Sequence, residues 1–164
     1  MTQLIFREME KADAGIIAEL ERMCFTLPWS KKLILDDLKN PLGYYLVGVL
    51  DGKIVTYCGM WIIIDEAHIT NIAVHPDYRR RGFGRAMMIE MMERAIGMGV
   101  NMMSLEVRKS NFAARAMYER LGYRQAGLRV AYYHDNDEDA IVMWNRDLSA
   151  SLDAVRSGLK VSRA

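Results

Sequence analysis

The spacing of hydrophobic residues changes along the chain, and each change marks the border of a predicted element. Alternating or continuous apolar runs between turn residues predict strands, and apolar residues repeating every three or four positions predict helices. Strands are predicted at residues 3–7, 44–50, 53–64, 67–74, 102–108, 123–133 and 140–147. Helices are predicted at residues 13–24, 30–39, 84–98 and 111–121.

The order of these elements is βααβββαβαββ. A strand meander followed by βαβα favours a mixed sheet with helices on its faces. No internal repeat or low-complexity linker divides the chain, so we predict one domain over residues 1–148. Residues 149–164 have only weak helical periodicity, and we expect them to form a frayed C-terminal tail.

Residues with strong local preferences support these borders. Asp13, Ser30 and Asn111 each precede a predicted helix and are good N-cap residues. Asp51-Gly52 separates two predicted strands and is typical of a hairpin with a primed turn.

Composition narrows the class of protein. The chain has 164 residues, of which 51% are hydrophobic and 26% charged, with a formal net charge of +1, so no overall basic field predicts nucleic-acid binding. No apolar run approaches the roughly 18 residues of a membrane span, and the acidic N-terminal sequence MTQLIFREME is unlike a signal peptide. Cys24 and Cys58 lack metal-ligand spacing, so we expect no metal site and a cytoplasmic protein.

The stretch YRRRGFGRA, residues 78–86, is the clearest candidate for ligand binding. Four arginines surround two glycines between the strand ending at Val74 and the helix that follows. A helix N-terminus offers unpaired N–H groups and a positive dipole end, and glycine lets a ligand approach the backbone. Cations at this end are unfavourable unless an anion binds there. The stretch therefore predicts a phosphate-bearing ligand, with a solvated basic helix start as the alternative.

Three kinds of phosphate ligand could bind such a loop. A nucleotide-binding Walker loop is not favoured, because Arg85-Ala86 stands where Lys and Ser or Thr are needed. A dinucleotide fingerprint fits poorly, because Met87 occupies the place of its third glycine and the connection from Val74 is long. The pyrophosphate of coenzyme A, cradled by R-x-x-G-x-G, is the favoured interpretation.

Three segments together resemble the GNAT N-acetyltransferases: PWS, NIAVHPDYRRRGFGRAMM and LEVRKSNFAARAMYERLGY. The similarity extends over residues 3–148, and the last segment resembles the protein N-terminal acetyltransferases in particular. The resemblance implies the GNAT fold, an α/β (α+β) arrangement with a mixed, mostly antiparallel sheet of six to seven strands and about four flanking helices. It also implies acetyl-CoA as the cosubstrate. His68 and Thr70, just before NIAV, depart modestly from the pattern.

Two residues are candidates for acid–base chemistry. Glu106 is flanked by apolar strand neighbours, and partial desolvation is expected to raise its pKa toward that of a useful base. Tyr118 lies on the following helix, and its phenol could protonate a departing thiolate. A solvated carboxylate and a core tyrosine are the alternatives. The resemblance implies that Glu106 is the general base and Tyr118 the general acid.

The resemblance also implies which residues bind coenzyme A. The backbone of the NIAV strand would face the pantetheine arm, the loop would hold the pyrophosphate, and the asparagine of SN would contact the coenzyme. These residues are Ile72, Ala73, Val74, Arg79, Arg80, Arg81, Gly82, Phe83, Gly84, Arg85 and Asn111. Neither cysteine has a fixed histidine partner in the sequence pattern, so direct attack in a ternary complex is favoured over an acyl-enzyme.

The acceptor is expected to be a protein N-terminus. An α-amino group has an ordinary pKa near 7.8, against about 10.4 for lysine, so a single carboxylate suits the α-amine. Pro28 and Trp29, with Tyr132 and Tyr133, are expected to bind the peptide, although a helix staple and strand packing would also explain them. An acidic turn at residues 135–139 could favour a basic residue near the start of the peptide, or could be a solvated hairpin tip.

The resemblance implies the N-terminal alanine of a small-subunit ribosomal protein as substrate. A broader set of protein N-termini or a small-molecule amine is the alternative within the family. A non-catalytic acyl-CoA-binding module is the alternative from another class, and Glu106 and Tyr118 argue against it.

Overall fold

The structure is a computed structural model that describes residues 3–158. It divides into two compact units. The first comprises the residues up to Ile62 together with Thr70–Met91, and the second comprises Ile63–Ile69 together with the residues from Met92 onward. Strands β3 (Lys53–Ile63) and β4 (Glu66–Val74) and helix α3 (Phe83–Gly97) contribute residues to both.

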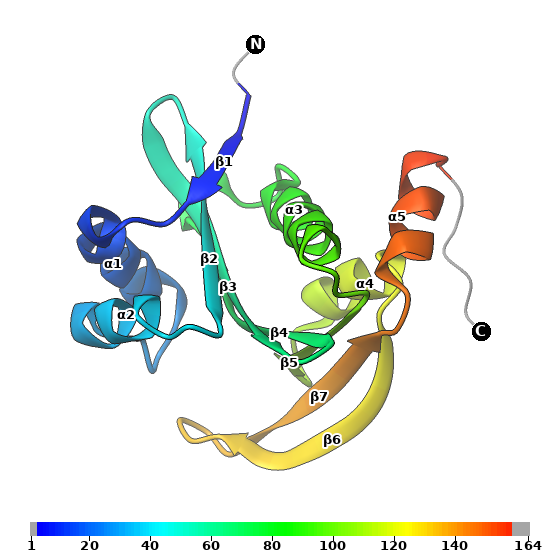
Figure 1. The fold of residues 1–164 in the computed structure, drawn as a ribbon. Helices are drawn as coiled ribbons and strands as arrows, with labels where there is room; N and C mark the ends of the chain where they lie inside the picture. The colour runs from blue at the N-terminus through cyan, green and yellow to red at the C-terminus, as the bar shows by residue number, and fades with distance from the viewer. Residues whose placement is uncertain (1–2, 159–164) are drawn as a thin grey trace. The chain divides into compact units, whose positions relative to one another are not determined.

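The first unit combines a meander of strands with two short helices. Figure 1 shows α1 and α2 together on one side of strands β1, β2 and β3. Residues of α1, α2, β2 and β3 share a single buried core. The turn between β2 and β3 has positive φ at both Asp51 (51°) and Gly52 (77°), which confirms the predicted primed turn. The elements are β1 (Ile5–Glu8), η1 (Lys11–Asp13), α1 (Ala14–Cys24), α2 (Lys31–Leu38), β2 (Gly43–Leu50), β3 (Lys53–Ile63) and η2 (Pro76–Tyr78).

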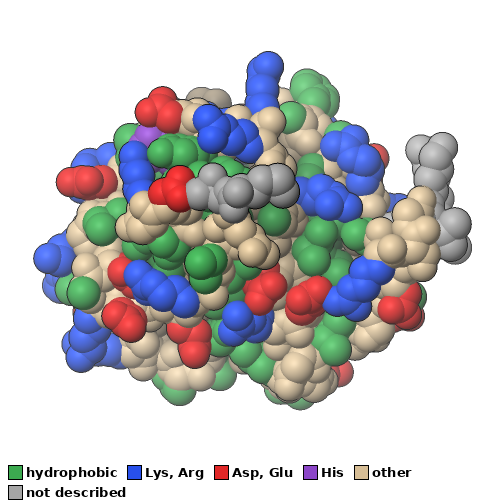
Figure 2. All heavy atoms as spheres, turned by 90° about the horizontal axis from the view of Figure 1, so that it is seen from above, with side chains coloured by type: hydrophobic (Ala, Val, Ile, Leu, Met, Phe, Trp, Pro, Cys, Tyr) green, Lys and Arg blue, Asp and Glu red, His purple; other side chains and the backbone are tan. Residues whose placement is uncertain are grey.

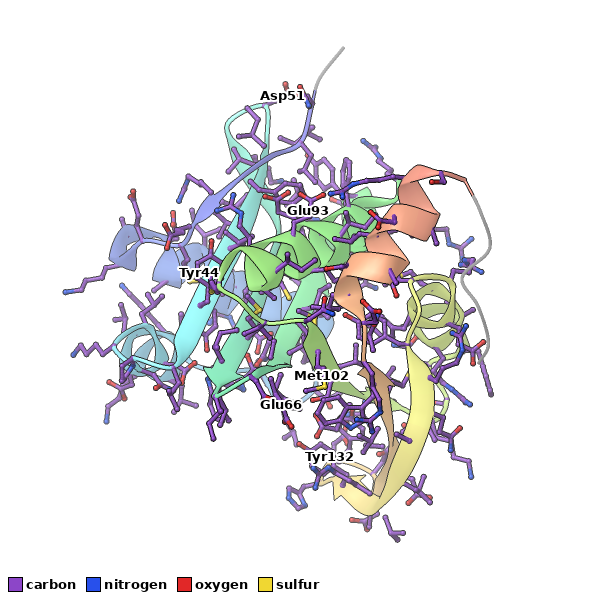
Figure 3. All side chains as sticks on the ribbon, turned by 45° about the vertical axis from the view of Figure 1, so that its right-hand side comes forward. Tyr44, Asp51, Glu66, Glu93, Met102 and Tyr132 are labelled. Atoms are coloured by element: carbon purple, nitrogen blue, oxygen red, sulfur yellow. The ribbon has the colours of Figure 1, made fainter. Side chains whose placement is uncertain are left out.

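The second unit contains a long curved hairpin of strands β6 and β7 (Figure 1). Its strands follow the order β4-β5-β7-β6, in which β4 and β5 are parallel and the other pairs are antiparallel. The parallel register joins Glu66–His68 to Met102–Ser104, and Figure 3 shows Glu66 beside Met102. The elements are β5 (Met102–Arg108), α4 (Phe112–Arg120), β6 (Arg124–Tyr133), β7 (Glu138–Asn145) and α5 (Leu148–Arg156).

The predicted fold class is confirmed. The strand order is β1-β2-β3-β4-β5-β7-β6, and the described residues hold seven strands and five α-helices. The β1–β2, β2–β3, β5–β7 and β6–β7 pairs are antiparallel. Predicted borders agree with the observed ones to within a few residues, because apolar periodicity and turn residues act locally.

The prediction of a frayed tail is wrong for residues 149–156, which belong to α5 (Leu148–Arg156). The Asp147 side chain caps this helix by accepting from the Ala150 N–H, and Leu148 and Leu152 are buried. Burial of these leucines therefore stabilises a helix that its weak local periodicity did not predict. Residues 159–164 lie outside the described part of the chain, and the single domain over residues 1–148 stays a prediction.

The predicted helix caps divide into two groups. Ser30 and Asn111 do cap α2 and α4, through their contacts with the N–H groups of Leu33 and Ala114. Asp13 does not cap α1 with its side chain, because that carboxylate instead binds Arg7 and the backbone N–H of Glu10.

Candidate functional site

The arginine-glycine loop lies in the first unit and leads directly into α3. Arg80 and Gly82 have positive φ angles of 62° and 79°. Gly82 precedes the helix, whose first N–H groups have no intrahelical partner, and the Ala86 N–H is the first to bond back, to the Gly82 carbonyl. No acidic residue lies in the first turn of α3. The loop thus has the backbone geometry and the charge of an anion site.

The arginines of this loop have different surroundings. Arg79 returns to the end of β4, where its Nε lies 3.3 Å from the Val74 carbonyl oxygen and its Nη2 lies 3.5 Å from Cys24 Sγ. Arg81 lies over the ring of Tyr78, with 5.2 Å between its Cζ and the ring centroid. Arg80 and Arg85 are exposed. Arg79 therefore contacts the protein at the start of the loop, and Arg80 and Arg85 are available to a ligand.

The NIAV strand residues that were expected to face pantetheine lie at the end of β4. The Ala73 carbonyl accepts from the Thr56 hydroxyl at 2.7 Å, and the Val74 carbonyl accepts from Arg79 and from the Cys24 thiol. Ile72 precedes them and is partly buried. Their role in binding the coenzyme stays a prediction.

A buried carboxylate holds the Pro28-Trp29 turn in the first unit, and the sequence did not reveal it. Glu21 on α1 is 1% exposed. Its Oε1 accepts from the backbone N–H of Trp29 (3.0 Å) and from the Asn71 amide (3.4 Å), and its Oε2 accepts from the Tyr57 hydroxyl (2.7 Å). Burial raises the pKa of Glu21. One carboxylate therefore ties the predicted peptide-binding turn to β3 and β4.

Glu106 lies in the middle of β5 in the second unit, and both of its oxygens have partners. Its Oε2 is 3.0 Å from His68 Nε2 on β4, and its Oε1 is 3.1 Å from Arg129 Nε on β6. The other ring nitrogen of His68, Nδ1, lies 2.9 Å from the Ser104 hydroxyl. Only 10% of the Glu106 side chain is exposed. The chain Ser104–His68–Glu106 has the residue types of a nucleophilic triad, but its serine is only 6% exposed.

The expected upward pKa shift of Glu106 is wrong. Burial does raise its pKa, but the hydrogen bond and charge of His68 and the charge and hydrogen bond of Arg129 lower it by more. The net pKa of Glu106 lies below its ordinary value. The sequence indicated the apolar strand neighbours correctly, but it could not show which cations the sheet register places beside the carboxylate.

Tyr118 and Asn111 both belong to α4 in the second unit. Tyr118 is 5% exposed, and its ring packs edge-on against Tyr123 with 5.9 Å between centroids. The Asn111 side-chain oxygen caps the helix by accepting from the Ala114 N–H at 3.2 Å. Tyr118 therefore lies in the core and Asn111 caps its helix as predicted, and the roles of both toward coenzyme A stay predictions.

Tyr132 and Tyr133 lie at the end of β6, next to a backbone irregularity at Ala131 (φ 50°), and Figure 3 shows Tyr132 near the end of the hairpin. Their rings meet edge to face at 5.2 Å between centroids. Arg108 lies over the Tyr133 ring, with 4.0 Å between its Cζ and the centroid. Burial raises the pKa of Tyr133 to about 12.

The acidic turn that follows is occupied by internal contacts. Arg108 forms ion pairs with Asp135 (2.7 Å) and Glu138 (3.2 Å). The Asp139 carboxylate accepts from the Ala131 N–H at 2.9 Å. These bonds stabilise the hairpin end, so the turn is not simply a solvated tip.

The predicted site residues thus fall into two sets. The first unit holds the loop, the end of β4 and the Pro28-Trp29 turn, and the second holds Glu106, Tyr118, Asn111 and the tyrosine pair. Sequence reasoning missed three residues: Glu21, His68 and Arg129. Side-chain alternation along a strand puts Ser104 and Glu106 on one face of β5, but no local signal identified His68 as their neighbour.

The surface charge is mixed. On the face shown in Figure 2, Lys and Arg side chains are interspersed with Asp, Glu and hydrophobic ones. Within residues 3–158, no three His, Cys, Asp or Glu side chains gather as a metal site would require. Over the same residues, no helix is both long and apolar enough to cross a membrane.

Comparison with known proteins identifies the class. Residues 15–123 match the model of the acetyltransferase (GNAT) family, so the chain belongs to this family and is an acetyltransferase.

Its similarity to individual members is more specific. It is 37% identical over 138 residues to the ribosomal protein bS18-alanine N-acetyltransferase of Escherichia coli (strain K12), covering 82% of this chain and 92% of that one. A Bacillus subtilis (strain 168) protein, named provisionally for the same activity, is 40% identical over 144 residues, covering 87% and 95%. The crystal structure of the ribosomal-protein-S18-alanine N-acetyltransferase from Escherichia coli matches with a TM-score of 0.81 at 32% identity, covering 99% and 96%.

Proposed function

We propose that this protein transfers the acetyl group of acetyl-CoA to the N-terminal alanine of ribosomal protein bS18 in the cytoplasm. The observation that carries this proposal is the similarity to the Escherichia coli enzyme named for that reaction, over 92% of its length. The largely buried carboxylate of Glu106 supports it, because an amine acceptor needs a base.

The donor would be held by the loop before α3. The exposed Arg80 and Arg85, together with the free N–H groups at the start of the helix, suit the pyrophosphate of the coenzyme. Gly82, with its positive φ, lets the chain turn into the helix through a left-handed backbone conformation that other residues adopt at a cost. The ends of β4 at Ile72, Ala73 and Val74 would bind the pantetheine arm, with Asn111 as a further contact.

The reaction would be a direct attack. The α-amine nitrogen forms a bond to the thioester carbonyl carbon, and the C–S bond then breaks. Glu106 takes a proton from the nitrogen, and Tyr118 gives one to the departing thiolate. Because the pKa of Glu106 is low, taking the proton from a free ammonium group would be costly. The α-amine, with an ordinary pKa near 7.8, therefore loses its first proton to solvent and attacks as the neutral amine. Its N–H becomes far more acidic once the N–C bond forms, so the weak base Glu106 suffices to take the second proton.

The peptide would be bound by Pro28 and Trp29 and by Tyr132 and Tyr133. Glu21 supports the first pair by holding the Trp29 backbone. The edge-to-face contact of Tyr132 with Tyr133 gives the second pair a fixed shape. A broader set of N-termini, or a small amine, is the competing proposal.

The test is acetylation by the purified protein. A peptide with the first residues of bS18 should gain one acetyl group in mass when acetyl-CoA is present, and the same peptide with a blocked N-terminus should gain none. Glu106→Gln should lower kcat/KM by about 10²- to 10⁴-fold, because general base catalysis contributes about that much. Its acetyl-CoA affinity should stay unchanged. Faster turnover of spermidine or an aminoglycoside than of the peptide would contradict the proposal.

The cellular substrate can be tested separately. Mass spectrometry of N-terminal peptides, from cells with and without this protein, should show loss of acetylation at the bS18 alanine. Loss at many unrelated N-termini would favour the broader specificity.

A further inference from the structure

Arg129 reaches Glu106 from β6, the last strand in the sheet order. The two side chains differ greatly in exposure: 53% of the Arg129 side chain is accessible, against 10% of Glu106. The contact runs from Nε to Oε1 over 3.1 Å. A carboxylate that must meet a substrate amine is therefore already occupied by an internal cation.

The two partners of Glu106 are not equally replaceable. His68 is fixed on its far side by the Ser104 hydroxyl, which is buried and lies on the neighbouring strand in register with His68. Arg129 has a long side chain that is more than half exposed, and the water around it weakens its ion pair. Oε1 is therefore the oxygen that another cation can take over.

The Arg129 guanidinium also has an alternative contact, the ring of Tyr132. Its Cζ lies 5.7 Å from the centroid of the Tyr132 ring, within the range of a cation–π contact. A guanidinium that leaves Oε1 would still have partners, because it can contact the ring of Tyr132 and water. The charged and titratable groups that face Glu106 in this unit are His68, Arg129, Tyr132 and Tyr133.

We propose that Arg129 occupies, at Glu106 Oε1, the position that the α-ammonium group of the substrate takes, and that the substrate displaces it toward Tyr132. The inference rests on the proposed function, since it assumes an α-amine acceptor. Arg129 is a positioning residue here: it keeps the carboxylate ionised and ordered before the substrate arrives.

The exchange also explains how the product would leave. The ammonium group competes for Oε1 as one cation against another, so the local charge is unchanged by the exchange. After acetylation the peptide carries a neutral amide, which cannot compete with a guanidinium for a carboxylate. Once Glu106 has released to solvent the proton that it took, Arg129 returns to Oε1. The site thus favours the charged substrate over the neutral product.

The test compares Arg129→Gln with the wild type in the presence of coenzyme A, by calorimetric binding of two peptides. One is the bS18 N-terminal peptide, and the other is its desamino analogue, which lacks only the α-amino group. Removing the competing cation should tighten binding of the ammonium peptide by about two- to fivefold, the equivalent of an exposed ion pair. Binding of the desamino peptide should not change.

Two further variants serve as controls. Arg129→Lys keeps a cation and should retain the wild-type ratio of the two affinities. Arg146→Gln removes an exposed arginine that lies over Trp144 and should change neither affinity. If Arg146→Gln tightened the ammonium peptide as much as Arg129→Gln does, net charge rather than exchange at Oε1 would be responsible.

The inference would be overturned if neither affinity changed in Arg129→Gln, or if the affinities for both peptides fell equally. In the second case Arg129 would be a direct peptide contact or a purely structural residue. Failure of the proposed function is a separate result, because the wild-type protein would then not acetylate the peptide at all.

Discussion

Glu106 shows how a single residue acquires its properties from neighbours that are distant in sequence. Its strand supplies a partly dry environment, which alone would raise its pKa. His68 and Arg129, from two other strands, reverse the sign of that shift. The carboxylate is therefore ionised across the physiological range and is poised to receive a cation rather than to hold a proton.

The contribution of His68 can be measured by replacing it with glutamine. His68→Gln removes the imidazole from Oε2 while retaining a hydrogen-bond donor. The pKa of Glu106 should then rise toward its ordinary value of about 4.3. Carboxyl ¹³C NMR titration would detect the change as a titration midpoint at higher pH than in the wild type. A midpoint that stays or falls would show that His68 does not lower the pKa of Glu106.

The elements of the first unit are joined by the buried carboxylate of Glu21. Glu21 joins α1 to the Trp29 turn, to β3 and to β4 through three donors. Removing a buried acceptor leaves such donors without partners, and each costs about 1–3 kcal/mol.

Glu21→Ala should therefore lower the free energy of unfolding by about 3 kcal/mol, measured by urea denaturation. Glu21→Gln keeps an acceptor and should lose less. Glu19→Ala, an exposed position on the same helix, should have almost no effect. Equal losses at positions 19 and 21 would mean that the hydrogen bonds of Glu21 do not matter for stability.

The entry to α3 depends on the backbone conformation of one glycine. Gly82 and Gly97 both have open space where a Cβ would lie, but only Gly82 has a positive φ, at 79°. Left-handed backbone costs an L-residue about 1–2 kcal/mol.

Gly82→Ala should destabilise the protein by about 1 kcal/mol, and Gly97→Ala should be neutral or stabilising by up to about 1 kcal/mol. Thermal unfolding of the two variants compares the same chemical change in two conformations. A stabilised Gly82→Ala would show that the loop does not need the left-handed conformation.

The stability of the whole molecule should depend on pH, because folding lowers the pKa of Asp13 and Glu106 but raises the pKa of Glu21. The hydrogen bond and charge of Arg7 lower the pKa of Asp13, despite the opposing effect of burial, and Glu106 is lowered as described. A lowered folded-state pKa stabilises the protein above the unfolded-state value, near 4, and this contribution is lost as the pH falls. Glu21, whose pKa is raised, acts in the opposite direction: its contribution is present below about 4 and is lost as the pH rises through its folded-state pKa.

Asp13→Asn should therefore flatten the acid side of the stability profile. The variant should be less stable than the wild type at pH 7, and the difference should shrink as the pH falls below about 4. Melting temperatures measured between pH 3 and 7 would show this convergence. A difference independent of pH would mean that the charge of Asp13 contributes nothing and only its shape matters.

The sequence alone determined the order and type of the strands and of four helices, the primed turn at Asp51-Gly52, the loop before α3 and the family. These depend on residue periodicity, turn preferences and contiguous motifs, all of which act between residues close in the chain. The tertiary structure decided that Leu148–Arg156 is a docked helix, that Glu21 holds the Trp29 turn, and that His68 and Arg129 flank Glu106. Burial and strand register set those contacts, and neither can be read from local spacing.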